Sequence, residues 1–178
     1  MQHFRAIADA VELPLVLYNV PGRTGCDLLP QTVVELAAHP RIVAVKEATG
    51  SVARAQQIIA ARGERQLALL SGDDPTAFAC TAVGGDGVIS VVSNVAPRMT
   101  HEMIAATRAG ELARGRELHY RLLPLVEALA ATTNPIPIKA AVSLLGFTAN
   151  ALRPPLTALA TAQQPPLKAL LAQLGLSR

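Results

Sequence analysis

The first half of the chain alternates between short apolar runs and segments of helical period. The apolar runs predict strands over residues 13–20, 42–46, 67–71 and 88–91. The segments between them predict helices over residues 4–11, 29–39, 51–62 and 73–83, with a loop at 21–25. Nearly continuous apolar strands are typical of a parallel sheet that is buried on both faces. The alternation therefore indicates βα units around a parallel sheet.

From residue 96 onward the pattern predicts helices alone, over residues 97–109, 112–131, 137–145 and 165–174. Four parallel strands leave two sheet edges uncovered. A complete (β/α)8 barrel takes about 250 residues, whereas this chain has 178. The expected fold class is therefore α/β: the C-terminal half of a (β/α)8 TIM barrel, about four βα units over residues 1–109, and then an all-helical C-terminal domain over 110–178.

Charge and composition exclude several classes of protein. The net charge is only +3 and no run of Lys or Arg occurs, so we expect no nucleic-acid surface. No stretch of about 18 apolar residues predicts a membrane span, and Met1–Arg5 lacks the apolar core of a signal peptide. Cys26, Cys80 and the four histidines have no ligand spacing, which predicts a reduced, cytoplasmic protein without a metal site.

Lys46 is the first candidate for chemistry, because it ends the apolar run that begins at Ile42. A buried ammonium is costly, and a desolvated amine is a nucleophile that can form a Schiff base. The alternative is a structural lysine whose head group reaches water. Lys139 is a rival nucleophile, but it follows a proline-rich joint at the start of a helix and is interpreted as structural. Asp73 and Asp74 are interpreted as a helix cap.

Five segments together point to a family. They are Tyr18–Gly25, Val45–Gly50, Leu70–Asp74, Gly84–Ser90 and Asn134–Lys139. In this order they resemble the dihydrodipicolinate synthases (4-hydroxy-tetrahydrodipicolinate synthases), which are members of the class I, pyruvate-dependent aldolase superfamily. The resemblance extends from about Gln2 to the C-terminus. It implies a lyase that condenses pyruvate with aspartate semialdehyde in lysine and diaminopimelate biosynthesis, without a cofactor and as a homo-oligomer.

The resemblance also assigns roles to individual residues. Lys46 matches the lysine that forms the Schiff base with pyruvate, and Tyr18 matches the tyrosine that relays protons. Arg23 matches the arginine that holds the carboxylate of aspartate semialdehyde. Gly72 and Ile89 match residues that line the pocket beside the lysine. Tyr18 and Lys46 end predicted strands, where barrel enzymes carry their catalytic groups.

The chain departs from the family pattern by what it lacks. The family's first four βα units would precede Gln2, with a Thr-Thr pair that binds the pyruvyl carboxylate and a second relay tyrosine. Thr132-Thr133 lies in the helical half and does not match that pair. The resemblance therefore implies a truncated synthase, and its activity stays open.

Two alternatives to the synthase also remain. One is another pyruvate aldolase, an N-acetylneuraminate lyase or a 2-keto-3-deoxy-sugar acid aldolase, which Arg23 would distinguish. The other is a non-catalytic half-barrel that acts through association. Two such half-barrels could pair along their uncovered sheet edges.

Overall fold

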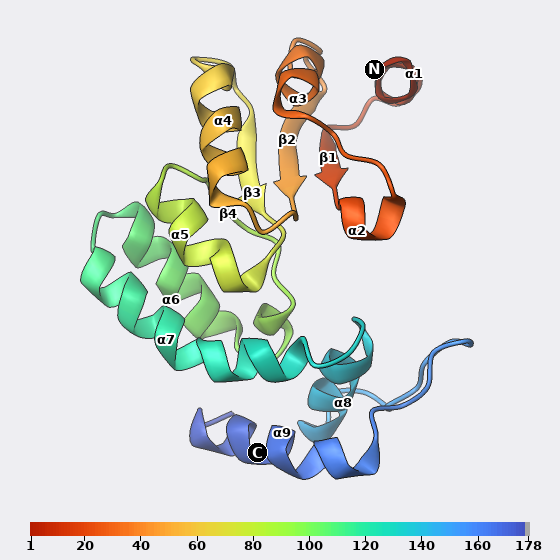
Figure 1. Cartoon of the computed structure of the whole chain (residues 1–178), viewed down its shortest axis with the longest axis vertical. Helices are drawn as coiled ribbons and strands as arrows, with labels where there is room; N and C mark the ends of the chain where they lie inside the picture. Colours follow the sequence, from red (N-terminus) through yellow and green to blue (C-terminus); the bar gives the residue numbers. More distant parts are fainter. Residues whose placement is uncertain (177–178) are drawn as a thin grey trace. The chain divides into compact units, whose positions relative to one another are not determined.

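The computed structural model describes residues 1–176, and its first compact unit is built on a parallel sheet. This unit spans Met1–Ile89 and contains four strands: β1 (Leu15–Asn19), β2 (Ile42–Glu47), β3 (Ala68–Ser71) and β4 (Gly87–Val88). All neighbouring pairs are parallel, and the order across the sheet is β1-β2-β3-β4 (Figure 1). The prediction of an α/β fold with a four-stranded parallel sheet is confirmed, and β1 and β4 are its edge strands.

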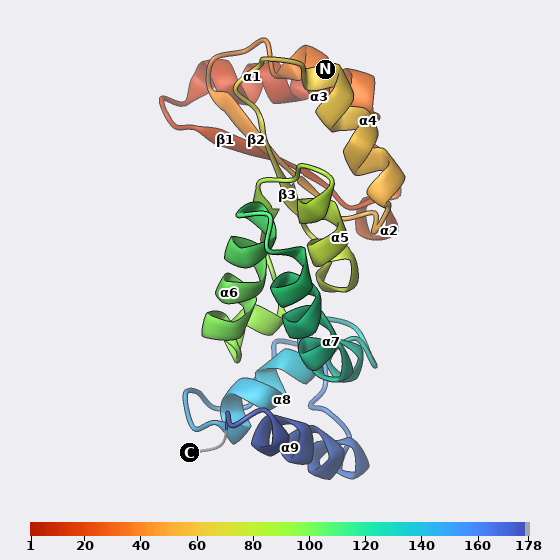
Figure 2. The same ribbon diagram turned by 90° about the vertical axis from the view of Figure 1, so that its left-hand side faces the viewer.

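Helices connect these strands in the predicted alternation. They are α1 (Gln2–Ala10), α2 (Pro21–Thr24), α3 (Pro30–Leu36), α4 (Val52–Arg62), the short 3-10 helix η1 (Asp74–Thr76) and α5 (Ala77–Ala82). Ser51 caps α4 as predicted, because its hydroxyl accepts a hydrogen bond from the Arg54 N–H at 3.2 Å. Asp73 caps η1 in the same way through the Thr76 N–H. Figure 2 shows α3 and α4 on one side of the sheet.

Two local predictions were wrong. The expected loop at residues 21–25 contains the single helical turn α2, because Pro21 suits a first helical position and Gly25 closes the turn with φ +65°. The fourth strand is also shorter than expected. The Ile89 N–H still bonds to the Ser71 carbonyl oxygen at 2.8 Å, but Ser90 then accepts a hydrogen bond from the Ser93 N–H and starts a turn.

The core of this unit lies between the sheet and its helices. Its fully buried members include Leu17, Val33, Leu36, Ile58 and Leu69. The expectation that the strands are buried on both faces is wrong for β1, where Val16 is 48% and Tyr18 is 46% exposed. The physical reason is that α3 and α4 cover only one face of the sheet, so alternate side chains of β1 point to the open face.

The second compact unit begins at Ser90 and is helical over the residues described. Its elements are η2 (Val92–Asn94), α6 (Pro97–Arg108), α7 (Leu112–Leu129), α8 (Ile136–Leu144), η3 (Thr161–Gln163) and α9 (Gln164–Gln173). The four helices predicted in this region are confirmed to within a few residues at their ends. Leu118, Leu122 and Leu125 of α7 are buried at helical spacing. Among residues 1–176, no helix is long and apolar enough to cross a membrane.

Candidate active site

Tyr18 and Lys46 lie side by side at the carboxyl edge of the sheet. They are direct partners in the β1–β2 register, and each stands one residue before the end of its strand. The Nζ atom of Lys46 lies 4.1 Å from the centroid of the Tyr18 ring. In its charged form this amine is attracted by the face of the ring, by about 0.5–1 kcal/mol at an exposed site. The strand register thus brings together an amine and a phenol that are 28 residues apart in sequence.

Gly72 adjoins the same lysine from the neighbouring strand. It directly follows β3, and its N–H donates to the Glu47 carbonyl oxygen at 2.7 Å. A methyl group at this position would lie 2.6 Å from Ala48 Cβ and 2.9 Å from Lys46 Cε. Only a glycine therefore leaves the Lys46 side chain its observed path along the sheet.

The two remaining predicted residues follow edge strands. Ile89 comes directly after β4 and is 43% exposed. Arg23 is exposed in α2, the helical turn that follows β1. Within residues 1–176, the guanidinium of Arg23 forms no ion pair. Four of the predicted residues thus lie at or directly after the carboxyl ends of strands in one sheet, and Arg23 lies in the helical turn after β1. Lys139, by contrast, lies in α8 of the second unit.

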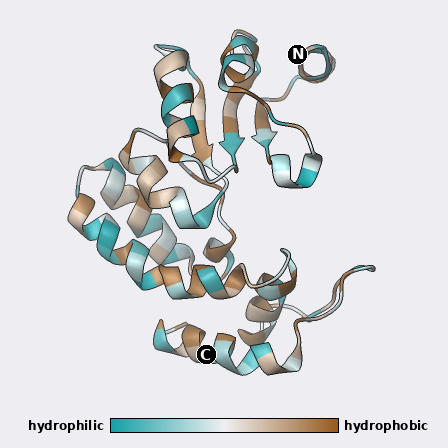
Figure 3. Cartoon of the chain, in the orientation of Figure 1, coloured by the Kyte–Doolittle hydropathy of each residue, from teal (hydrophilic) through white to brown (hydrophobic). Residues whose placement is uncertain are grey.

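Sequence reasoning missed a row of buried polar residues at the same edge. Asn19, Glu47 and Ser71 are paired across β1, β2 and β3, and each is at most 5% exposed. In Figure 3, β1 and β2 change from brown to teal toward their carboxyl ends. The signal was present in the sequence, because each of these strands changes from apolar to polar within its last two residues.

Hydrogen bonds join this row to the segment that follows α2, the helical turn that carries Arg23. The Asn19 amide donates to Glu47 Oε2 at 2.9 Å and to Asp27 Oδ1 at 3.0 Å. Asp27 also accepts two hydrogen bonds from Arg54, at 2.7 and 3.0 Å. The hydrogen bond from Asn19, with a smaller contribution from Arg54, holds the pKa of Asp27 below its usual range.

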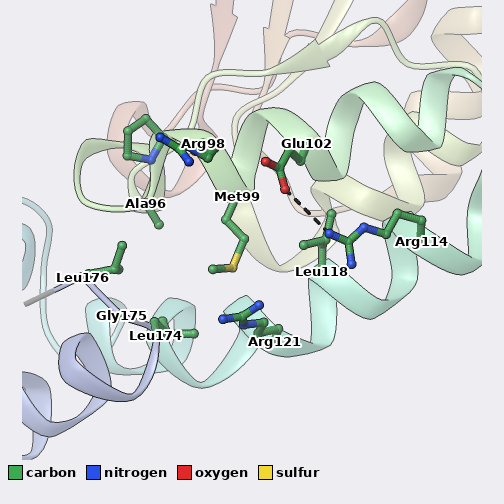
Figure 4. Close-up of a pocket in the computed structure, with 11 residues that line it drawn as sticks. Ala96, Arg98, Met99, Glu102, Arg114, Leu118, Arg121, Leu174, Gly175 and Leu176 are labelled. Carbon is green, nitrogen blue, oxygen red and sulfur yellow. Dashed lines mark ion pairs between the residues drawn. The ribbon is translucent and has the colours of Figure 1, made fainter.

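A separate pocket of about 530 Å³ lies in the second unit (Figure 4). Arg98, Arg114 and Arg121 line it together with Glu102. Arg114 is paired with Glu102 at 3.7 Å and with Glu117 at 2.9 Å. This pocket shares no residue with the predicted site. In the part of the chain that the structure describes, no three His, Cys, Asp or Glu side chains are grouped to hold a metal ion.

A parallel α/β sheet with adjoining reactive side chains at its carboxyl edge defines a class of proteins whose binding sites lie at that edge. Comparison with family models identifies the group within this class, since the dihydrodipicolinate synthetase family matches residues 1–174. The chain belongs to this family.

Individual relatives agree with the family match. The chain is 50% identical over 175 residues to a 4-hydroxy-tetrahydrodipicolinate synthase of Dechloromonas aromatica, covering 98% of this chain and 60% of the relative. The solved chloride-inhibited dihydrodipicolinate synthase from Acinetobacter baumannii, complexed with pyruvate, is 43% identical with a TM-score of 0.94, and the match covers 98% and 60% of the two chains. The lysine-bound enzyme from Cyanidioschyzon merolae is 39% identical with a TM-score of 0.93, at 98% and 59% coverage. The chain thus spans about 60% of the length of these relatives.

Proposed function

We propose that the chain carries the Schiff-base site of a 4-hydroxy-tetrahydrodipicolinate synthase, with Lys46 as the nucleophile toward pyruvate. The observation that carries this proposal is the 4.1 Å approach of Lys46 Nζ to the Tyr18 ring at the carboxyl edge of the sheet. The amine adds to the ketone of pyruvate, and loss of water gives the Schiff base. The pyruvate bound to the A. baumannii relative supports pyruvate as the partner.

The neighbouring residues have complementary roles in the proposal. Tyr18 gives a proton to the departing hydroxyl and takes it back from the adduct, since its ring adjoins the reacting amine and a phenol can donate and accept a proton. Gly72 and Ile89 shape the pocket for the pyruvyl group beside Lys46. Arg23 holds the carboxylate of aspartate semialdehyde, since a guanidinium binds a carboxylate through two parallel hydrogen bonds.

The biological setting follows from this chemistry and from the family. Condensation of pyruvate with aspartate semialdehyde places the chain among the lyases of lysine and diaminopimelate biosynthesis. The reacting groups are an amine and a phenol, so the proposed reaction uses no cofactor. The free state of Cys26 and Cys80 in the structure is compatible with the reducing cytoplasm, which we propose as the location.

We also propose that the chain is the C-terminal half of a TIM barrel followed by a helical domain. The order of strands and helices, β1-α3-β2-α4-β3-α5-β4-α6, supports four βα units ending near Ala109. The helices from α7 onward would then form the domain at residues 110–178. The coverage of about 60% of its relatives supports a partial barrel. A homo-oligomer is part of this proposal, because β1 and β4 each lack a neighbour on one side among the described residues.

Consumption of pyruvate tests the proposed condensation. We expect the purified chain to consume pyruvate only when aspartate semialdehyde is also present, and the Lys46→Arg variant to consume none, because its guanidinium is not a nucleophile. Pyruvate that binds but is never consumed would contradict the condensation. It would instead identify the non-catalytic half-barrel that the sequence left open.

The identity of the second substrate, the aldehyde, can be tested through Arg23. We expect Arg23→Gln to raise the KM for aspartate semialdehyde by roughly tenfold to a hundredfold, because a charged hydrogen-bond partner is lost. The KM for pyruvate should change little. Equal use of an aldehyde without a carboxylate would favour a sugar-acid aldolase over the synthase.

A further inference from the structure

The pairing of β1 with β2 contains a shift in register. Leu15 is paired with Ile42, but the next residue, Val16, is paired with Ala44, so Val43 has no partner on β1. This is a β-bulge, with two residues of one strand opposite one residue of the other. Without the bulge, β1 would pair one position earlier along β2, and Asn19 rather than Tyr18 would lie beside Lys46.

A register change of one residue has a large effect at this position. Side chains alternate between the two faces of a strand, so the slip would turn Tyr18 to the covered face and bring Asn19 beside Lys46. The apolar run over residues 42–45 consists of similar aliphatic side chains and discriminates weakly between the two registers. A contact after the bulge must therefore select the observed one.

Asn19 and Glu47 supply this contact directly beyond the pair Tyr18 and Lys46. They are partners in the observed register, and the Asn19 amide donates to Glu47 Oε2 at 2.9 Å. The other carboxylate oxygen of Glu47, Oε1, accepts the Thr49 N–H at 2.8 Å. Asn19 Oδ1 accepts the Leu28 N–H at 2.9 Å. Each side chain thus joins its own strand end to the turn or loop that follows.

Stability alone is a weak explanation for this pair. Glu47 is 5% exposed, and within residues 1–176 no ion pair neutralises its carboxylate. A buried polar group of this kind is often no better for stability than apolar residues of the same volume. Buried polar contacts are best known for selecting one register over another.

We propose that Asn19 and Glu47 are positioning residues that select the β1–β2 register in which Lys46 faces Tyr18. The selection of the register is a structural property. Only its effect on catalysis, the correct placement of the Lys46 amine for pyruvate, rests on the proposed function. The hydrogen bonds of Asn19 to Asp27 and Leu28 extend the same control to the segment directly after α2, the helical turn that carries Arg23.

Glu47→Gln is the sharpest variant, because it keeps the shape of the side chain. A glutamine has one oxygen and one NH2 group, whereas Glu47 accepts hydrogen bonds on both oxygens. In either orientation the NH2 group faces a donor, at Asn19 or at Thr49. The matched control is Asp86→Asn, since Asp86 Oδ2 accepts hydrogen bonds from Arg62 at 2.7 Å and from the Leu69 N–H at 2.8 Å, near the amino end of β3.

Two readouts separate this inference from the proposed function. The first is the NMR shift of the Lys46 ε-methylene group, which the Tyr18 ring should displace upfield and which needs no pyruvate. The second is the rate at which borohydride traps pyruvate on Lys46. We expect Glu47→Gln to lose the upfield displacement and to slow trapping by roughly tenfold to a hundredfold, since misplacement by about 1 Å costs up to that much. Asp86→Asn should lower the unfolding temperature without changing either readout.

The outcomes are distinct. The inference would be overturned if the Glu47→Gln chain kept the wild-type upfield displacement of the Lys46 signal. It would also be overturned if Asp86→Asn lost that displacement to the same extent. If the wild-type chain traps no pyruvate, the proposed function fails. The upfield displacement of the Lys46 ε-methylene signal still decides whether Asn19 and Glu47 select the register. If Glu47→Gln does not fold, Glu47→Asp replaces it. Its shorter carboxylate can keep only one of the two contacts, so part of the displacement should be lost, and full retention would contradict the proposal.

Discussion

At the scale of single residues, the Lys46 side chain is confined by its neighbours. Tyr18 lies against its amine, and Gly72 leaves its methylene groups just enough room beside Ala48. The motifs in the sequence identified these residues, because their spacing matches a known family. Asn19 and Glu47 were not identified, since their contact depends on a strand register that the apolar run does not specify.

Substitution of Gly72 tests this confinement. We expect Gly72→Ala to lower the free energy of unfolding by about 1–3 kcal/mol, because the added methyl group overlaps Ala48 Cβ and Lys46 Cε. Displacement of Lys46 should also slow Schiff-base formation with pyruvate. Chemical denaturation and borohydride trapping measure the two effects. The control is Gly22→Ala, where an added methyl group meets no atom within 4 Å. Equal behaviour of the two variants would argue against a confined lysine.

Cys80 gives a prediction about pH. Burial, together with the charges of Glu47 and Asp86, raises the pKa of this thiol from 9.0 to about 11. The folded chain thus favours the protonated thiol, so its contribution to stability is complete below pH 9 and is lost as the pH rises to about 11. We expect the free energy of unfolding of wild type to fall more steeply across this window than that of Cys80→Ala. Parallel curves from denaturant titrations would contradict the assignment.

At the scale of elements, capping residues and breakers predicted most boundaries. Ser51 and Asp73 both accept the hydrogen bonds expected of caps. The pattern was less informative where the chain turns sharply. Pro21 to Gly25 contains both helix-starting and helix-ending signals, and composition alone does not distinguish one helical turn from a loop. The apolar run after Gly87 suggested a longer strand than the two residues of β4. The observed strand is short because the turn that begins at Ser90 ends the pairing.

The cap of α4 can be tested directly. We expect Ser51→Ala to lower the free energy of unfolding by about 0.5–2 kcal/mol, because the Arg54 N–H loses its acceptor. Ser51→Gly should cost only a few tenths of a kcal/mol, since glycine is itself tolerated at this position. Thermal or urea denaturation of the three chains gives the comparison. A loss in Ser51→Gly that equals the loss in Ser51→Ala would show that the hydroxyl contributes in another way.

At the scale of the whole molecule, the first unit has an open sheet face and two edge strands. Val16, Tyr18 and Val43 are between 38% and 48% exposed, and β1 and β4 each lack a neighbour on one side among the described residues. The sequence predicted the uncovered edges from the number of strands. It did not predict the open face, because continuous apolar runs look alike whether one face or both are covered.

These features predict self-association. We expect the purified chain to sediment as a dimer or larger oligomer at micromolar concentration, because exposed edges and apolar faces favour pairing. Val16→Lys should weaken the association by placing a charge on the open face of β1. Lys substitution at Ala113, an exposed position of α7, is the control. A wild-type chain that stays monomeric would refute the expected pairing.

Lys46 is the residue on which the proposed chemistry depends, because its amine forms the Schiff base with pyruvate. Incubation with pyruvate and borohydride, followed by peptide mass spectrometry, tests this role most directly, because reduction turns the Schiff base into a stable Nε-(1-carboxyethyl)-lysine. Lys139 and Lys168, the other two lysines in the sequence, are internal controls in the same sample. We expect the adduct on Lys46 and unmodified peptides for the other two. No adduct, or equal modification of all three lysines, would contradict this role of Lys46.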